Sequence, residues 1–189
     1  MDANEALKQI EELEKVLPTP AAETEERLTL VEKIWKQSLT EKDVPDDMYQ
    51  AFVRSVLTNV PFTYAFTAMK GELTVVFSEP RGNLAKRHST LRSKLEPDQM
   101  EEISQIAILT HLEKITSKRM QKPLYERPDD MLSGDIPVTN ADVSDMIHAE
   151  YANFISNQGE SISRIIPSMW LILSGLWNFM LQREIPTDF

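Results

Sequence analysis

The sequence predicts a mostly helical α+β fold with about seven helices and one β-hairpin at residues 62–78. Along most of the chain, apolar residues recur at the three- and four-residue spacing of amphipathic helices. One stretch, between Pro61 and Pro80, instead alternates with the two-residue period of a strand. At 189 residues we expect a single domain with an N-terminal helical arm (1–40) and an irregular loop (121–138).

The alternation at 62–78 also predicts how the two strands pair. A two-residue turn at Lys70-Gly71 would pair Met69 with Glu72, Ala68 with Leu73, Phe66 with Val75 and Tyr64 with Phe77. This register gathers the apolar side chains on one face, and a one-residue shift would mix the faces. Because an isolated hairpin is marginally stable, we expect helices or another chain to cover that face. As the only predicted β element, the hairpin would also need its open edges shielded or extended by another chain.

Prolines and capping residues mark the limits of the expected helices. The expected helical segments are 2–17, 21–39, one opened by Pro45, 83–95, 97–119, one opened by Thr139, and 165–181. Asn83 is the expected N-cap of the fourth segment, and Thr139 with Asp142 resembles a capping box. The helix opened by Pro45 should bury a stripe formed by Met48, Phe52, Val53, Val56 and Leu57.

The net charge of −10 is unevenly distributed. Residues 1–60 carry −6, residues 61–122 carry +3, and residues 123–189 carry −7. The basic middle would suit an acidic partner or the acidic ends of this same chain. The overall negative sign disfavours free nucleic acid as a partner. The chain has no cysteine and its charged N-terminus does not resemble a secretory signal, so we expect a reducing compartment.

No residue pattern indicates catalysis, a cofactor or a metal. His88, His111 and His148 each stand alone in the sequence, and we interpret them as surface or internally hydrogen-bonded side chains. The nucleophile, phosphate-binding and dinucleotide-binding motifs do not occur. We therefore predict no catalytic, cofactor-binding or metal-binding residues, and we leave an enzyme without a recognisable motif as a minor alternative.

The most apolar stretch, residues 165–181, contains two large aromatic residues. Its 17 residues would span about 26 Å as a helix, less than the roughly 30 Å of a bilayer core. We therefore expect a buried helix and keep a membrane-associated helix as an alternative. Trp170 and Trp177 would lie on one side of it, where large aromatic side chains are interface candidates.

A helix followed by PFTYAF, KG and ELTVVF resembles the tail-assembly and baseplate-assembly proteins of tailed bacteriophages. The matching residues are Phe52, Pro61, Phe62, Phe66, Gly71, Leu73, Val75 and Phe77, together with the aromatic C-terminus around Trp177 and the closing IPTDF. The resemblance implies a non-enzymatic protein of the virion or host cytoplasm. Such a protein chaperones the tape-measure or hub protein, or is built into the virion.

These observations lead to a hypothesis of function through protein–protein contacts. The expected partners are hub, tape-measure or baseplate components, and we expect an oligomer or a hetero-complex. The residues predicted to bind a partner are Tyr64, Phe66, Arg81, Arg87, Lys94, Trp170, Trp177 and Phe189. A cytoplasmic adaptor protein, or a membrane-associated protein that uses 165–181, are the alternatives.

Overall fold

The computed structural model describes residues 30–184. The chain divides into a unit of residues 1–43 and a unit of residues 44–189, near the end of the predicted N-terminal arm. The predicted helix at 2–17 and the first nine residues of that at 21–39 lie outside the described residues, and the described part of the second ends at residue 35, four residues before the predicted Leu39. In the first unit, residues 30–35 are helical and a short 3₁₀ helix, η1, spans Glu41–Asp43.

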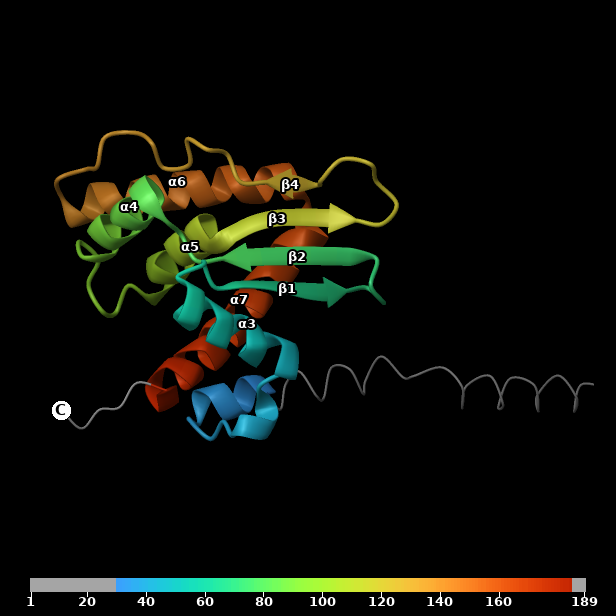
Figure 1. The fold of residues 1–189 in the computed structure, drawn as a ribbon. Coiled ribbons are helices and arrows are strands. Elements are labelled where there is room, and N and C mark those ends of the chain that lie inside the picture. Colours follow the sequence, from blue (N-terminus) through green and yellow to red (C-terminus); the bar gives the residue numbers. More distant parts are fainter. Residues whose placement is uncertain (1–29, 185–189) are drawn as a thin grey trace, which may run out of the picture. The chain divides into compact units, whose positions relative to one another are not determined.

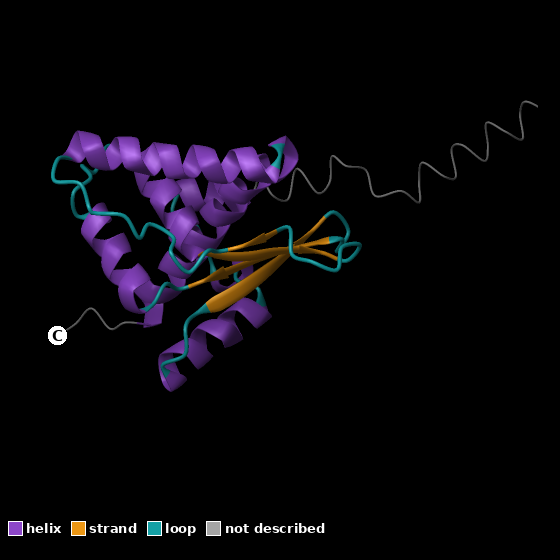
Figure 2. Ribbon diagram, turned by 90° about the horizontal axis from the view of Figure 1, so that it is seen from above, coloured by secondary structure: helices purple, strands orange, loops and turns teal. Residues whose placement is uncertain are grey.

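The second unit has the predicted α+β character, with one antiparallel sheet in the order β1-β2-β3-β4. Its elements are α3 (Asp46–Thr58), β1 (Thr63–Ala68), β2 (Leu73–Ser78), α4 (Gly82–Arg92), α5 (Met100–His111), β3 (Leu112–Ser117), β4 (Tyr125–Glu126), α6 (Asn140–Gln158) and α7 (Glu160–Glu184). Figures 1 and 2 show that α5, α6 and α7 cover one face of this sheet. Thus five α-helices and η1 lie wholly within residues 30–184, against about seven helices predicted for the chain.

The register predicted for the hairpin is confirmed. β1 and β2 pair from Thr63 with Ser78 to Ala68 with Leu73, so Phe66 faces Val75 as expected. The apolar face is buried, with Leu73, Val75 and Phe77 at 4%, 0% and 1% exposure.

The turn of this hairpin is longer than predicted. It occupies residues 69–72: the N–H of Glu72 donates to the carbonyl of Met69 at 3.1 Å, as a two-residue turn requires, but the ladder ends at Ala68 and Leu73. Three consecutive residues, Met69, Lys70 and Gly71, have positive φ. The strands therefore separate one residue earlier than a two-residue turn would require.

The prediction of one helix over residues 97–119 is wrong beyond His111. The chain becomes extended at Leu112, and β3 pairs with β2 through contacts such as Ile115 with Val75. Leu112 and Ile115 continue the helical spacing of α5, but pairing with β2 satisfies the backbone groups of this segment as well as a helix would. The hairpin is therefore not the only β element, because β3 covers the open edge of β2 and the expected loop 121–138 supplies β4.

The helix ends confirm one of the two predicted caps and correct the other. Thr139 caps α6, where its hydroxyl accepts from the backbone N–H of Asp142 at 3.2 Å. Gly159 ends the same helix with φ of 76°. Helix α4 begins at Gly82, so Asn83 lies inside its first turn and gives no side-chain cap.

The C-terminal helix is longer than the predicted segment 165–181. Helix α7 runs for 25 residues, and Ser161–Arg183 is long and apolar enough to cross a membrane by length and composition alone. This overturns the argument that the segment is too short to span a bilayer. One side of the helix is nevertheless buried in the protein core through Ile166, Met169, Trp170, Leu173, Leu176 and Met180.

Candidate functional site

The predicted partner-binding residues fall into three structural settings, apart from Phe189, which lies outside the described residues. Tyr64 and Phe66 lie on the helix-covered face of β1, with ring centroids 5.0 Å apart, and both are half-buried. Trp170 is only 8% exposed and contacts Phe77, with ring centroids 5.8 Å apart.

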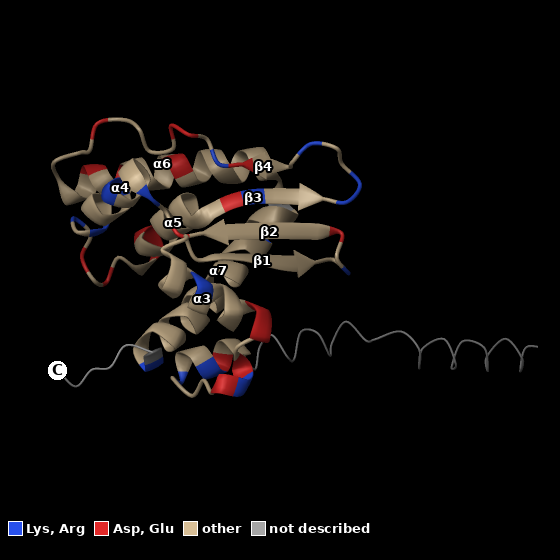
Figure 3. Cartoon of the chain, viewed as in Figure 1, with Lys and Arg blue, Asp and Glu red and all other residues tan. Residues whose placement is uncertain are grey.

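The basic side chains of α4 and the turn after it contact the chain's own long loop. Arg87 donates to the carbonyl oxygen of Gly134, and Nζ of Lys94 donates to that of Val138 at 3.2 Å. Figure 3 shows Lys and Arg on α4 and at the β3–β4 turn, with Asp and Glu along the loop that precedes α6. Arg87 and Lys94 therefore bind backbone oxygens of the acidic loop itself. This favours contact of the basic segment with its own chain over a basic surface that is free for a partner.

Arg81 and Trp177, in contrast, both line a groove between α3 and α7, which we call the α3–α7 groove. Its volume is about 340 Å³, and its lining includes Val56, Val60, Phe62, Glu79, Arg81 and Trp177. Its floor is aromatic, because Phe62 contacts both Phe52 and Trp177, at centroid distances of 6.2 and 5.0 Å.

Hydrogen bonds hold one wall of the groove in place. Arg81 donates to the carbonyl oxygen of Asn59, which adopts a left-handed φ of 52°. Glu79 accepts from the backbone N–H of Phe62 through its carboxylate at 3.3 Å, and its own N–H donates to the carbonyl of Phe62 at 2.8 Å. The connection from α3 to β1 is thus fixed at both ends, so the groove exists before any partner binds.

The rim of the groove is more apolar than the sequence analysis predicted. Val56 and Val60 line the groove and are 65% and 42% exposed, and the neighbouring Leu57, outside the lining, is 78% exposed. The expectation that Val56 and Leu57 belong to the buried stripe of this helix is wrong, because only Met48 and Phe52 are buried. The sequence did contain a signal of this exposure. The predicted stripe has five apolar positions on a helix of 13 residues, which is more than one contact surface buries.

The outer edge of β1 begins next to the α3–α7 groove, because Phe62, which lines the groove, directly precedes the first residue of β1. The N–H of Glu79 bonds to the carbonyl of Phe62, so alternate residues 64, 66 and 68 turn their backbone groups toward β2. Thr63, Ala65 and Thr67 consequently turn theirs outward, and no strand within residues 30–184 pairs with them. Their side chains are exposed as well, and none is charged.

Two of the histidines that stand alone in the sequence are neighbours in the structure. The rings of His88 and His111 lie edge to face at 5.3 Å, and Nδ1 of each contacts the Thr110 hydroxyl, at 2.8 and 3.1 Å. Nδ1 of His111 donates to the carbonyl of Ala107 at 2.8 Å. Burial lowers the pKa of His111 to about 4 and also lowers that of His88.

This histidine cluster has the character of a structural network. The hydroxyl of Thr110 lies within hydrogen-bond distance of the carbonyl of Ile106, at 2.8 Å, and His111 packs on Trp170 at 4.7 Å. Within residues 30–184, no group of three or more His, Cys, Asp or Glu side chains is placed to hold a metal ion. The third histidine, His148, is exposed and lies 3.8 Å from a carboxylate oxygen of Glu102.

Comparison of the chain with protein-family models, curated proteins and solved structures gives no match in any of the three.

Proposed function

We propose that this chain is a non-enzymatic assembly protein that binds another protein through the α3–α7 groove and the outer edge of β1. The exposed apolar rim formed by Val56 and Val60, with the exposed Leu57 next to them in the chain, is the observation that carries the proposal. Burying one such side chain in an interface contributes about 1.5–3 kcal/mol. Apolar side chains grouped around a hollow are typical of contact surfaces, whereas isolated ones are ordinary on any protein surface.

The composition of the groove supports a protein partner. Trp177 lies half-buried in the wall, and tryptophan is among the residues that dominate binding energy at interfaces. The adjoining β1 edge offers backbone donors and acceptors to an extended segment of a partner. One segment can therefore pair with β1 while an apolar side chain enters the groove.

The proposed partners are the hub, tape-measure or baseplate components of a bacteriophage tail, in the virion or the host cytoplasm. This part of the proposal depends on the resemblance described above. Three of the residues that carry it, Phe52, Phe62 and Trp177, form the floor and wall of the groove. The resemblance and the apolar surface thus concern the same region of the chain.

A double variant on the rim and a single control variant elsewhere test the surface. Val56→Asp with Val60→Asp places two charges on the rim, and Val138→Asp places a charge on an equally apolar residue that is 86% exposed elsewhere. The test measures the molar mass of the full chain by light scattering, and its binding to purified products of the neighbouring reading frames. We expect the rim variant to lose self-association or binding and the Val138 variant to keep it. A wild-type chain that stays monomeric and binds none of these products would overturn the proposal.

A membrane-associated role remains the second candidate because α7 has sufficient length and apolarity. The burial of one side of α7 against the rest of the second unit argues against it. Flotation of the full chain with lipid vesicles separates the two candidates. Recovery of the chain with the vesicles would favour the membrane role, and recovery at the bottom of the gradient would exclude it.

A further inference from the structure

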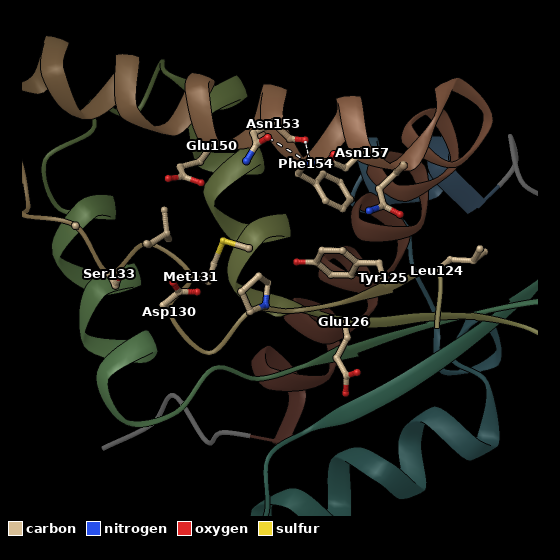
Figure 4. A pocket seen from close by; sticks show the side chains of 14 residues that line it. Leu124, Tyr125, Glu126, Asp130, Met131, Ser133, Glu150, Asn153, Phe154 and Asn157 are labelled. Carbon is tan, nitrogen blue, oxygen red and sulfur yellow. Dashed lines mark hydrogen bonds between the residues drawn. The ribbon is translucent and has the colours of Figure 1, made fainter. Parts of the chain in front are cut away.

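A second hollow lies between α6 and the loop that follows β4, apart from the α3–α7 groove. Its volume is about 510 Å³, within the range of small-molecule sites. One wall is aromatic, because Tyr125 and Phe154 meet edge to face at 5.1 Å. Figure 4 shows these two rings beside Met131, with Glu150 and Asn153 projecting from α6 above them. We call this hollow the α6 pocket.

The hydroxyl of Tyr125 has no hydrogen-bond partner in the protein although its oxygen is buried. In Figure 4 it points from the aromatic wall toward Met131 and the space below Asn153. Burial raises the pKa of Tyr125 to about 12, so the hydroxyl is protonated at neutral pH. A phenol in this state still has free lone pairs that accept from an N–H donor.

The charged residues that line the α6 pocket are all acidic: Glu126, Asp130 and Glu150. Two arginines that adjoin lining residues of the pocket are directed to other partners. Arg127 donates to the carbonyl of Thr110, and Arg87 donates to that of Gly134 at the edge of the pocket. The pocket therefore combines negative charge with aromatic faces and contains no cation of its own among its lining residues.

We infer that the α6 pocket binds an organic cation, a primary ammonium or guanidinium group carried on an aliphatic stem. Such a group donates N–H bonds to carboxylates, to the free lone pairs of Tyr125, and to the second lone pair of the Asn153 amide oxygen, which already accepts from Asn157 at 3.2 Å. The rings of Tyr125 and Phe154 attract the charge through their faces, and they cover the stem. A free polyamine and a Lys or Arg side chain of a partner share this chemistry.

Binding of defined amines to the full-length chain tests the inference, with cadaverine and N-acetyl-lysine methylamide as probes. Two-dimensional NMR or calorimetry measures the dissociation constant of each. 1,5-Pentanediol has the length of cadaverine without its charge, so it is the matched ligand control. Binding of both amines, or of cadaverine alone, supports the inference, and tighter binding of the lysine derivative identifies a partner's side chain as the source.

Two carboxyl variants locate the site. Glu150→Gln removes a charge from the pocket, and Asp145→Asn removes one from an exposed position of the same helix outside it. We expect Glu150→Gln to weaken amine binding about tenfold and Asp145→Asn to leave it unchanged. Thermal unfolding of each variant verifies that it is folded. The inference is overturned if the diol binds as well as cadaverine, if neither amine binds saturably, or if the two variants weaken binding equally.

Discussion

The imidazole rings of His88 and His111 lie edge to face, 5.3 Å apart, and the hydroxyl of Thr110 contacts a nitrogen of each. The two residues belong to α4 and to the end of α5, so this contact depends on the packing of the two helices. Because His111 is buried, protonating it costs free energy in the folded state that it does not cost in the unfolded chain. The cluster therefore makes stability depend on pH.

We predict that the free energy of unfolding decreases as pH falls below about 6.5. The pKa of His111 is 6.5 in the unfolded reference and about 4 in the folded chain, so the unfolded chain binds more protons between these values. The contribution is complete above pH 6.5 and is lost progressively toward pH 4. It amounts to about 2 kcal/mol between pH 7 and pH 5, and His88 acts in the same direction. Urea unfolding at a series of pH values measures this change in the free energy of unfolding.

Two histidine variants control this prediction. His111→Gln should be less stable at pH 7 and should show a flatter pH dependence between pH 5 and 7. The loss of stability between pH 7 and pH 5 should persist in His148→Gln, because His148 is exposed and its ring is not part of the cluster. The carboxyl of Glu102 has a lowered pKa through its hydrogen bond with Ser144, and it adds a separate loss only below about pH 4.5. Equal slopes in all three proteins would contradict the assignment to His111.

We predict that proline is tolerated at Ala65 and not at Phe66. The N–H of Ala65 points away from β2, whereas that of Phe66 lies in the ladder opposite Val75. Phe66→Pro removes both a ladder hydrogen bond and a half-buried aromatic side chain, so it should destabilise the fold by about 3 kcal/mol or more, and Ala65→Pro by much less. Urea unfolding measures both. If a partner strand adds to β1, Ala65→Pro should also abolish that binding while the chain stays folded, and retained binding would remove the β1 edge from the proposed surface.

The sequence contains enough information for the hairpin because its two faces differ sharply in polarity. The pairs Phe66–Val75 and Tyr64–Phe77 follow from alternation alone, and the structure confirms them. β3 was not predictable in this way, since Leu112 and Ile115 fit the helical spacing of α5 as well as a strand. Only the presence of β2 beside this segment decides between the two conformations, and that is tertiary information.

The candidate site was predictable only in part for a similar reason. Arg81 and Trp177 were both expected to bind a partner, but nothing in their spacing indicates that they share one groove. The loop 121–138 was an expected interaction surface, but the α6 pocket itself was not predicted, because its walls come from this irregular loop and from one side of α6. The acidic pair at residues 129–130 and the aromatic residues of α6 were visible signals, but their juxtaposition depends on where the loop folds back.

We predict that the two tryptophans of α7 have different roles. Trp170 is 8% exposed and packs between Phe77 and His111, so Trp170→Ala should cost about 3–5 kcal/mol of stability. Trp177 is only half-buried in the groove wall, so Trp177→Ala should cost less stability and reduce partner binding. Unfolding in urea and binding at a temperature where both variants are folded separate the effects. Equal losses of stability and binding in the two variants would contradict the division.

We predict that Tyr125→Phe makes the chain as stable as, or about 1 kcal/mol more stable than, the natural chain without a ligand. Its hydroxyl oxygen is buried without a partner, and an unpaired buried hydroxyl costs about 1–3 kcal/mol. Tyr64→Phe is the control, because its hydroxyl donates to Asp47 at 3.4 Å, and its removal should be neutral or slightly destabilising. Thermal unfolding of the three proteins, with and without cadaverine, makes the comparison. If the amine binds at Tyr125, the natural chain should gain more stability from cadaverine than Tyr125→Phe does. A clear loss of stability in ligand-free Tyr125→Phe would contradict the prediction, because it would show that the hydroxyl is already hydrogen-bonded.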